Sequence, residues 1–91
     1  MNHTHQMPVK FRLVQAIYQK KNISNQEILE ILKNEYPSDR SVNEQGVEDY
    51  LLTLLTTGLI ELTNTTLDND RKLKMCYELT DHGMNLMKYI N

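Results

Sequence analysis

The chain has 91 residues, of which 40 % are hydrophobic and 24 % are charged, and its formal net charge is −2. This composition is that of one ordinary globular domain, and it excludes a disordered or fibrous protein. The slightly negative charge disfavours a protein that binds nucleic acid through net charge alone, and no apolar run is long enough to span a membrane.

The cellular compartment is predicted from features that the chain lacks. It has no charged-then-apolar segment of the kind that begins a secretion signal. Its single cysteine, Cys76, cannot form an internal disulfide, which is typical of a reducing compartment. We therefore expect a cytoplasmic protein.

Residues 1–8 are expected to form a flexible arm, and residues 9–91 a single domain. The arm is polar, has no periodicity and ends at Pro8. It contains His3 and His5, but two histidines on a mobile segment lack the further ligands that a metal site needs. We therefore expect no metal site in the arm.

Two helices are expected in the first half of the domain. The first runs from residue 9 to about residue 21, because its apolar residues recur at helical spacing, and Asn22 ends it. The second begins at Ser24, which has capping-box spacing to Glu27, and ends before Pro37. The residues expected to face the core are Val9, Leu13, Val14, Ile17, Tyr18, Ile28, Ile31 and Leu32.

A third helix is expected from residue 42 to residue 57. Ser41 and Glu44 repeat the capping-box spacing, and Gly58 suits the left-handed angle that closes a helix. Gly46 costs about 1 kcal/mol relative to alanine inside a helix. We attribute it to tolerance in the first turn, with close approach to a partner as the alternative. The apolar stripe of this helix is Val47, Tyr50, Leu51, Leu54 and Leu55.

A β-hairpin and a last helix are expected to follow. The strands are predicted at residues 59–62 and 72–79, and the sequence Asp68-Asn69-Asp70 between them is turn-forming. Because side chains alternate along a strand, one face should carry Leu73, Met75, Tyr77 and Leu79, and the other Lys72, Lys74, Cys76 and Glu78. Thr80 is expected to cap the last helix, which carries Met84, Met87 and Ile90 at helical spacing.

Together these elements predict an α+β fold that is mostly helical. The second and third helices, joined by a short turn, form a helix-turn-helix within a three-helix bundle. The two-stranded hairpin must pack against the helices, because an isolated hairpin is only marginally stable in water. In such a motif the second helix enters the major groove of DNA.

Two short motifs stand at the ends of the expected hairpin. Gly58-Leu59-Ile60 opens it, and the segment Tyr77-Glu78-Leu79-Thr80-Asp81-His82-Gly83 closes it. Together they resemble the small winged helix-turn-helix transcriptional regulators of the MarR and PadR type. In those families a Gly-Leu-Ile stretch opens the first wing strand, and the second runs into a Tyr-x-Leu-Thr-x-x-Gly signature. The resemblance covers about half of the chain, residues 41–83, and implies a winged helix.

The resemblance further implies a DNA-binding transcriptional regulator, a repressor that occupies an operator in double-stranded DNA. The recognition helix would enter the major groove, and a basic wing would lie on the DNA backbone. The residues expected to contact DNA are Arg40, Gln45, Arg71, Lys72 and Lys74. A homodimer is also implied, and the last helix offers Leu86, Tyr89 and Ile90 as apolar surface for it.

The acidic side chains of the third helix favour a second hypothesis. Residues 42–62 contain four acidic residues and no basic one, whereas families of this type usually have Ser, Thr, Arg or Lys on the exposed face. Carboxylates that face a phosphate-lined groove are repelled unless nearby bases offset them. The alternative is a winged-helix protein–protein interaction module, for instance one encoded by a phage or mobile element. Its third helix would bind a basic partner through Glu44, Glu48 and Asp49.

No catalytic site and no cofactor are expected. The sequence has no glycine-rich phosphate loop, no metal-ligand spacing and no nucleophile with a base beside it, so we expect no enzyme. Cys76 lies beside Lys72 and Lys74 on the expected outward face and is a candidate oxidation sensor. A small apolar filler is the preferred interpretation of this cysteine. His82 is expected to have a surface or capping role.

Overall fold

The computed structural model describes residues 7–90, and for Ile90 only the backbone. The elements in chain order are α1 (Val9–Gln19), β1 (Ile23–Ser24), α2 (Asn25–Glu35), α3 (Glu44–Thr56), β2 (Ile60–Leu67), β3 (Leu73–Leu79) and α4 (Asp81–Ile90). Most of the expected arm, with His3 and His5, lies outside the described residues. Met7 is described, and its carbonyl accepts a hydrogen bond from the Tyr36 hydroxyl.

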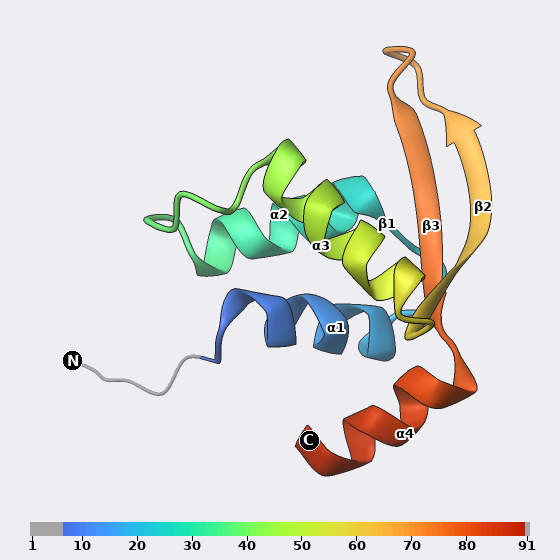
Figure 1. Ribbon diagram of the computed structural model, residues 1–91. Helices are drawn as coiled ribbons and strands as arrows, with labels where there is room; N and C mark the ends of the chain where they lie inside the picture. The colour runs from blue at the N-terminus through green and yellow to red at the C-terminus, as the bar shows by residue number, and fades with distance from the viewer. Residues whose placement is uncertain (1–6, 91) are drawn as a thin grey trace.

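Three helices pack beside one sheet, and the hairpin formed by β2 and β3 projects beyond them as a wing (Figure 1). α2 contacts both α1 and α3, and α1 and α2 both contact β3. α4 lies at the base of the sheet, away from the wing tip, where it contacts α1 and β3. This arrangement confirms the predicted mostly helical α+β fold.

The sheet has three antiparallel strands in the order β1-β3-β2, not the two that we predicted. The additional strand, β1, consists only of Ile23 and Ser24, which lie opposite Tyr77 and Cys76. A strand of two residues has no detectable period, which is why the sequence pattern did not predict it. Its consequence is that β3 is the central strand and is bonded on both sides.

The predicted capping box at the start of α2 is confirmed. The Ser24 hydroxyl accepts from the Glu27 N–H at 3.0 Å, and the Glu27 carboxylate accepts from the Ser24 N–H at 3.1 Å. Lys20 forms an ion pair with the same carboxylate. These contacts, with the Lys20 hydrogen bond as the main cause, hold the pKa of Glu27 below its usual value. Just before them, Asn22 takes a left-handed φ of 61° and turns the chain after α1.

The predicted capping box at the start of α3 is wrong. The helix begins at Glu44, and its cap is Asn43, whose side-chain oxygen accepts from the Gly46 N–H at 2.8 Å. Ser41 is engaged elsewhere, because its hydroxyl donates to the Asp39 carboxylate at 2.7 Å. Ser and Asn are equally good caps, so the choice between them depended on the loop that precedes the helix.

Gly46 is required by the close approach of this same loop. A Cβ atom at position 46 would lie 1.9 Å from the carbonyl oxygen of Ser41, which is far inside any allowed contact. The glycine is therefore not merely tolerated in the first turn, as we had interpreted it. The approaching group is the chain's own backbone, not a partner.

The core lies between the helices and the inner face of the sheet. Tyr77 is among the largest fully buried side chains, at 1 % exposure, and burial raises the pKa of its hydroxyl. The other buried members of this cluster are Val9, Leu13, Ala16, Ile17, Ile23, Ile28, Leu32, Tyr36, Val42, Val47, Leu51 and Ile60. Tyr18, predicted to face the core, is 41 % exposed because α1 ends one residue after it.

The two motifs at the ends of the hairpin bond directly to each other. The Thr80 hydroxyl donates to the carbonyl of Gly58 at 2.6 Å and accepts from the N–H of Gly83 at 3.1 Å. The Thr80 N–H donates to the Leu59 carbonyl at 3.1 Å, and a Cβ atom at Gly83 would lie only 2.1 Å from that oxygen. Gly58 has the predicted left-handed angle, with φ 77°. We call this set of contacts the hairpin junction.

The first wing strand is longer than predicted and contains a bulge. β2 runs to Leu67, whereas we expected its strand to end at Leu62. Its pairing with β3 shifts by one residue between Leu62 and Asn64, so Thr63 has no partner. Because side chains alternate along a strand, this extra residue places Leu62 and Leu67 on the same face of the hairpin.

The alternation predicted for β3 agrees with the register of the sheet, which keeps Leu73 and Tyr77 on one face and Cys76 on the other, but burial does not follow the face. Leu73 is 48 % exposed because the wing extends beyond the helices there. Cys76, expected to point outward, is only 8 % exposed because it lies in the central strand, opposite Ser24 and Asn64. A buried thiol lacks the access that an oxidation sensor requires, which favours the filler interpretation.

Replacing Thr80 by valine is expected to lower the free energy of unfolding by about 1–2 kcal/mol, because it removes a helix cap and a hydrogen bond while keeping the side-chain shape. Urea denaturation measures this change. Thr66→Val makes the same atomic exchange on an exposed part of β2 and serves as the control. Equal stability losses in the two variants would contradict the role of the hairpin junction.

Candidate nucleic-acid interface

The outward face of α3 is acidic and apolar. Gln45, Glu48, Asp49 and Leu52 follow one another at helical spacing, and all four are exposed. Gln45 does not project freely, because its side-chain nitrogen donates to the Asp49 carboxylate at 2.9 Å. Glu44, in the first turn, is also exposed. The face that would enter a major groove therefore carries three carboxylates.

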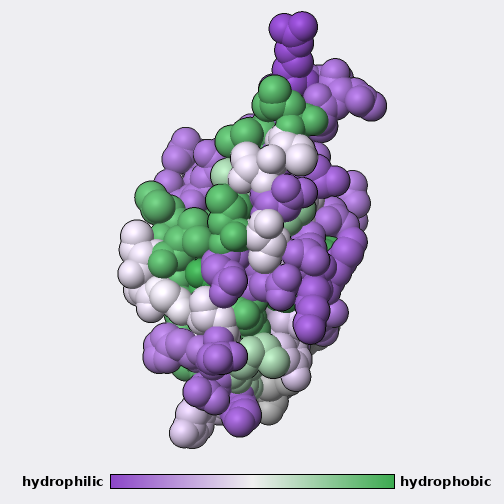
Figure 2. Space-filling view, turned by 90° about the vertical axis from the view of Figure 1, so that its right-hand side faces the viewer, coloured by the Kyte–Doolittle hydropathy of each residue, from purple (hydrophilic) through white to green (hydrophobic). Residues whose placement is uncertain are grey.

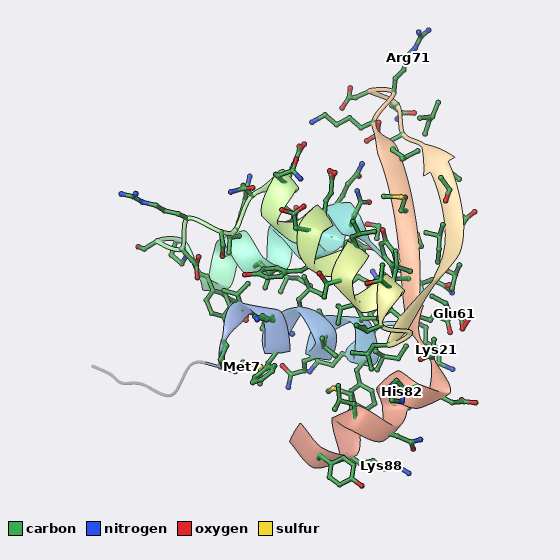
Figure 3. All side chains as sticks on the ribbon, in the orientation of Figure 1. Met7, Lys21, Glu61, Arg71, His82 and Lys88 are labelled. Atoms are coloured by element: carbon green, nitrogen blue, oxygen red, sulfur yellow. The ribbon has the colours of Figure 1, made fainter. Side chains whose placement is uncertain are left out.

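The three basic residues of the wing point in different directions. Arg71 lies at the wing tip and extends away from the rest of the molecule (Figure 3). The Lys72 ammonium lies 3.6 Å from the Glu44 carboxylate, so it bridges the wing to the start of α3. Lys74 lies opposite Thr66, on the strand face that points away from Tyr77. The wing thus carries exposed cations, but one of them is already paired with an acid of α3.

The wing turn is shaped by Asp68. Its carboxylate accepts from the backbone N–H groups of Asp70 and Lys72, each at 2.9 Å, and from the side chain of Gln26 in α2 at 2.9 Å. These bonds, above all the one from Lys72, hold the pKa of Asp68 below its usual value. They also place Arg71, which takes a left-handed φ of 61° inside the turn.

The remaining bases do not join the wing in one positive face. Arg40 is exposed in the loop between α2 and α3, which lies on the opposite side of the bundle from the wing (Figure 1). Arg12 binds Glu35 through two nitrogens, at 2.7 and 2.9 Å, and holds the pKa of that carboxyl below its usual value. Lys20 is paired with Glu27. The structure therefore separates Arg40 from the predicted contact residues of the wing, Arg71, Lys72 and Lys74.

Two grooves separate α3 from the wing. The larger, about 640 Å³, lies between α2, the start of α3 and the wing tip. Its charged lining residues are Glu30, Lys33, Glu44, Glu48, Asp68, Asp70 and Lys72. The smaller, about 340 Å³, lies between α3 and the strands, and is lined by Gln45, Glu48, Asp49, Leu51, Leu52, Leu55, Leu62, Met75 and Tyr77.

Neither a metal site nor a membrane span is found in the part of the chain that the structure describes. Among residues 7–90 no three histidine, cysteine or acidic side chains are grouped so that they could hold a metal ion. Within the same range no helix is long and apolar enough to cross a bilayer.

Comparison with known proteins gives structural matches but no sequence matches. No protein-family model and no curated protein match the sequence. A PadR-like transcriptional regulator from Bacillus cereus has 20 % identity and a TM-score of 0.69 over 89 % of this chain and 75 % of that one. Bacillus subtilis PadR, in complex with operator DNA, has 23 % identity and a TM-score of 0.70 over 90 % of this chain. MarR has 17 % identity and a TM-score of 0.60 over 93 % of this chain.

The protein has the winged-helix fold. This confirms, for the fold, the predicted resemblance to MarR-like and PadR-like regulators. The first neighbour is a PadR-like transcriptional regulator, and the second is in complex with operator DNA. The chain spans only 46 % of the PadR chain and 54 % of the MarR chain, so both neighbours contain substantial parts that have no counterpart here.

Three features of the site were missed by sequence reasoning. Asp68 was identified only as a turn former, although an aspartate that opens a loop commonly binds N–H groups two residues on. Leu52 was not assigned to any face, although its spacing from Gln45, Glu48 and Asp49 places it on their side of the helix. The contact between Lys72 and Glu44 had no local signal, because it joins two elements that are distant in the sequence.

Protonation of Asp68 is expected to loosen the wing turn. Because the folded pKa of Asp68 is lowered, the ordered turn should persist above the usual aspartate value of about 3.9 and be lost as the pH falls through the lower folded value. The amide signals of Asp70 and Lys72 in NMR spectra should report this transition. Asp68→Ala should speed hydrogen exchange at both amides at neutral pH.

The matched control is Asp70→Ala, which removes a neighbouring acid whose side chain makes no hydrogen bond in the described structure. It should leave the exchange rate of Lys72 unchanged. Equal effects of the two substitutions would show that Asp68 does not organise the turn.

Proposed function

We propose that the protein is a non-enzymatic, DNA-binding transcriptional regulator that acts in the cytoplasm. The observation that carries the proposal is the exposed helix α3 standing beside a projecting wing with Arg71 at its tip. Bacillus subtilis PadR, which shares this fold, has a crystal structure in complex with operator DNA. In this arrangement α3 would lie in the major groove, and the wing would follow the sugar-phosphate backbone.

The wing cations are proposed to supply most of the attraction to DNA. Arg71 and Lys72 would contact phosphates, and Lys74 would do so from the outer face of the wing. Gln45 is the side chain on α3 best suited to read a base, because its amide can bond the two major-groove positions of adenine. To do so it must release the Asp49 carboxylate that it now binds. Arg40 would reach a phosphate beyond the start of α3.

The backbone at Arg71 supports a role for its side chain. A residue with a Cβ atom at a left-handed angle costs roughly 1–2 kcal/mol relative to a conformation it prefers. Glycine would avoid this cost at position 71, where φ is 61°. The arginine therefore places a cation at the outermost point of the wing at some expense of stability, as strained residues at functional sites often do.

Repression by occupying an operator, as a homodimer, completes the proposal. The exposed apolar residues of α4 are Met84, Leu86 and Tyr89, the last at 87 % exposure. Two copies joined through this helix would present two wings to adjacent half-sites, as symmetric DNA-binding dimers do. Sedimentation equilibrium at tens of micromolar is expected to give the mass of a dimer, and a monomer would refute this part of the proposal.

Arg71→Gly is expected to weaken binding to random duplex DNA while keeping or raising folding stability, because it removes both the cation and the backbone strain. The dependence of log affinity on log salt should become shallower by about one for this single phosphate contact. Fluorescence anisotropy at several salt concentrations measures both quantities. Lys88→Ala removes the same charge from α4, far from the wing, and should change neither (Figure 3). Absence of any binding to duplex DNA at low salt would overturn the proposed function.

Glu44→Gln is expected to strengthen binding to duplex DNA. It releases Lys72 from its 3.6 Å ion pair and removes a carboxylate from the groove-facing side, so DNA affinity should rise. Glu61→Gln makes the same charge change near the base of the sheet and should have a smaller effect (Figure 3). Equal gains from both variants would show that only net charge matters.

A further inference from the structure

Exposed leucines gather on the side of the molecule where α3 faces the wing. Four of them are Leu52, Leu62, Leu67 and Leu73, with exposures of 60 %, 47 %, 65 % and 48 %. Figure 2 shows apolar side chains below the wing tip and again at the middle of this face. Single exposed leucines are common on protein surfaces, but a contiguous group of them marks a binding surface.

The sheet pairing shows that these residues belong to one continuous surface. Leu67 lies opposite Leu73 and Leu62 opposite Tyr77, so the bulge at Thr63 brings both β2 leucines onto the inner face of the wing. Leu52 of α3 and Leu62 line the smaller groove together. Met75 borders both grooves and joins them. We call this surface the leucine groove.

The charged rim of the leucine groove is predominantly acidic. In its lower part, between α3 and the strands, Glu48 and Asp49 are the only charged lining residues within the described chain. The acids of the upper part, toward the wing tip, are Glu30, Glu44, Glu48, Asp68 and Asp70, against the bases Lys33 and Lys72. Lys72 is already paired with Glu44. An occupant of the groove would therefore meet a negative potential around an apolar floor.

We propose that the leucine groove binds a basic, amphipathic helical segment of another protein. The apolar side of that helix would cover Leu52 and Leu62, and its lysine or arginine side chains would meet Glu48 and Asp49. Binding an amphipathic helix in an apolar groove is a common mode of peptide recognition. This site shares Gln45 and Lys72 with the proposed DNA contacts but not Arg71, so a bound helix would cover part of the outward face of α3 and compete with DNA there.

The charge of the rim selects this occupant over two others. A phosphate backbone laid along the groove would face the carboxylates and gain nothing from the leucines. A second copy of this chain, related by a twofold axis, would place the same acidic rim against itself. A positively charged helix with one apolar side would form ion pairs with the acidic rim and cover the leucines on the floor of the groove.

The test uses two synthetic helices of equal length, one made of leucine and lysine and the other of leucine and glutamate. Titration calorimetry with the full chain should show binding of the lysine helix that weakens with salt, and no binding of the glutamate helix. NMR shift changes should fall on α3, β2 and β3. The double variant Leu52→Gln and Leu62→Gln should weaken binding by about tenfold or more.

Three control measurements keep the proposal open to refutation. Leu86→Gln removes an exposed leucine of α4 and should bind the lysine helix as the unchanged protein does. Arg71→Gly should also leave peptide binding intact. A variant that loses DNA binding but keeps peptide binding would separate the DNA proposal from this one. Urea denaturation should show that the double variant is folded.

Several outcomes would overturn the proposal. Equal binding of both helices would show that the acidic rim has no role, and a Leu86→Gln variant as weak as the double variant would place the contact elsewhere. Self-association of the chain that the double variant abolishes would show that a second copy occupies the groove.

Discussion

The geometry of the whole site depends on one hydroxyl group, that of Thr80. It joins the carbonyl of Gly58, where α3 has just ended, to the N–H of Gly83, where α4 begins. The two strand ends of the wing are thereby fixed to each other and to the last turn of α3. With the base of the wing fixed in this way, hydrogen bonds with Asn25 and Gln26 of α2 hold its upper part, where Lys72 meets Glu44. The junction also requires glycine at positions 58 and 83. Gly58 has a left-handed backbone angle, and a side chain at Gly83 would collide with the carbonyl of Leu59.

The helices were predicted well because their signals are local. The capping box of Ser24 and Glu27 and the left-handed Gly58 are read within a few residues, and both are confirmed. The errors came where the competing contact lies outside the pattern that was read, either in the adjoining loop or in a distant strand. Ser41 has the right spacing for a cap, but the preceding loop engages it and Asn43 takes its place. The burial of Cys76 depends on a two-residue strand that meets it across a large separation in sequence.

In the candidate site, too, local features were predicted and contacts between distant elements were not. Sequence reasoning located the exposed acids of α3 and the basic wing, because both are runs of charge in identifiable elements. It did not predict that Glu44 and Lys72 neutralise each other across the groove, or that a bulge at Thr63 turns Leu67 inward. Arg71 stands at the wing tip, whereas the acids and leucines lie between α3 and the wing together with Lys72.

The short strand β1 also affects how the chain folds during synthesis. Ile23 is synthesised 54 residues before its partner Tyr77. The nascent helices therefore remain without a sheet to cover them until β3 has been made. Closing such a long loop is slow compared with forming a helix. The apolar helix faces stay exposed during this interval, and a chain cut before residue 77 would lack the strand that closes the core.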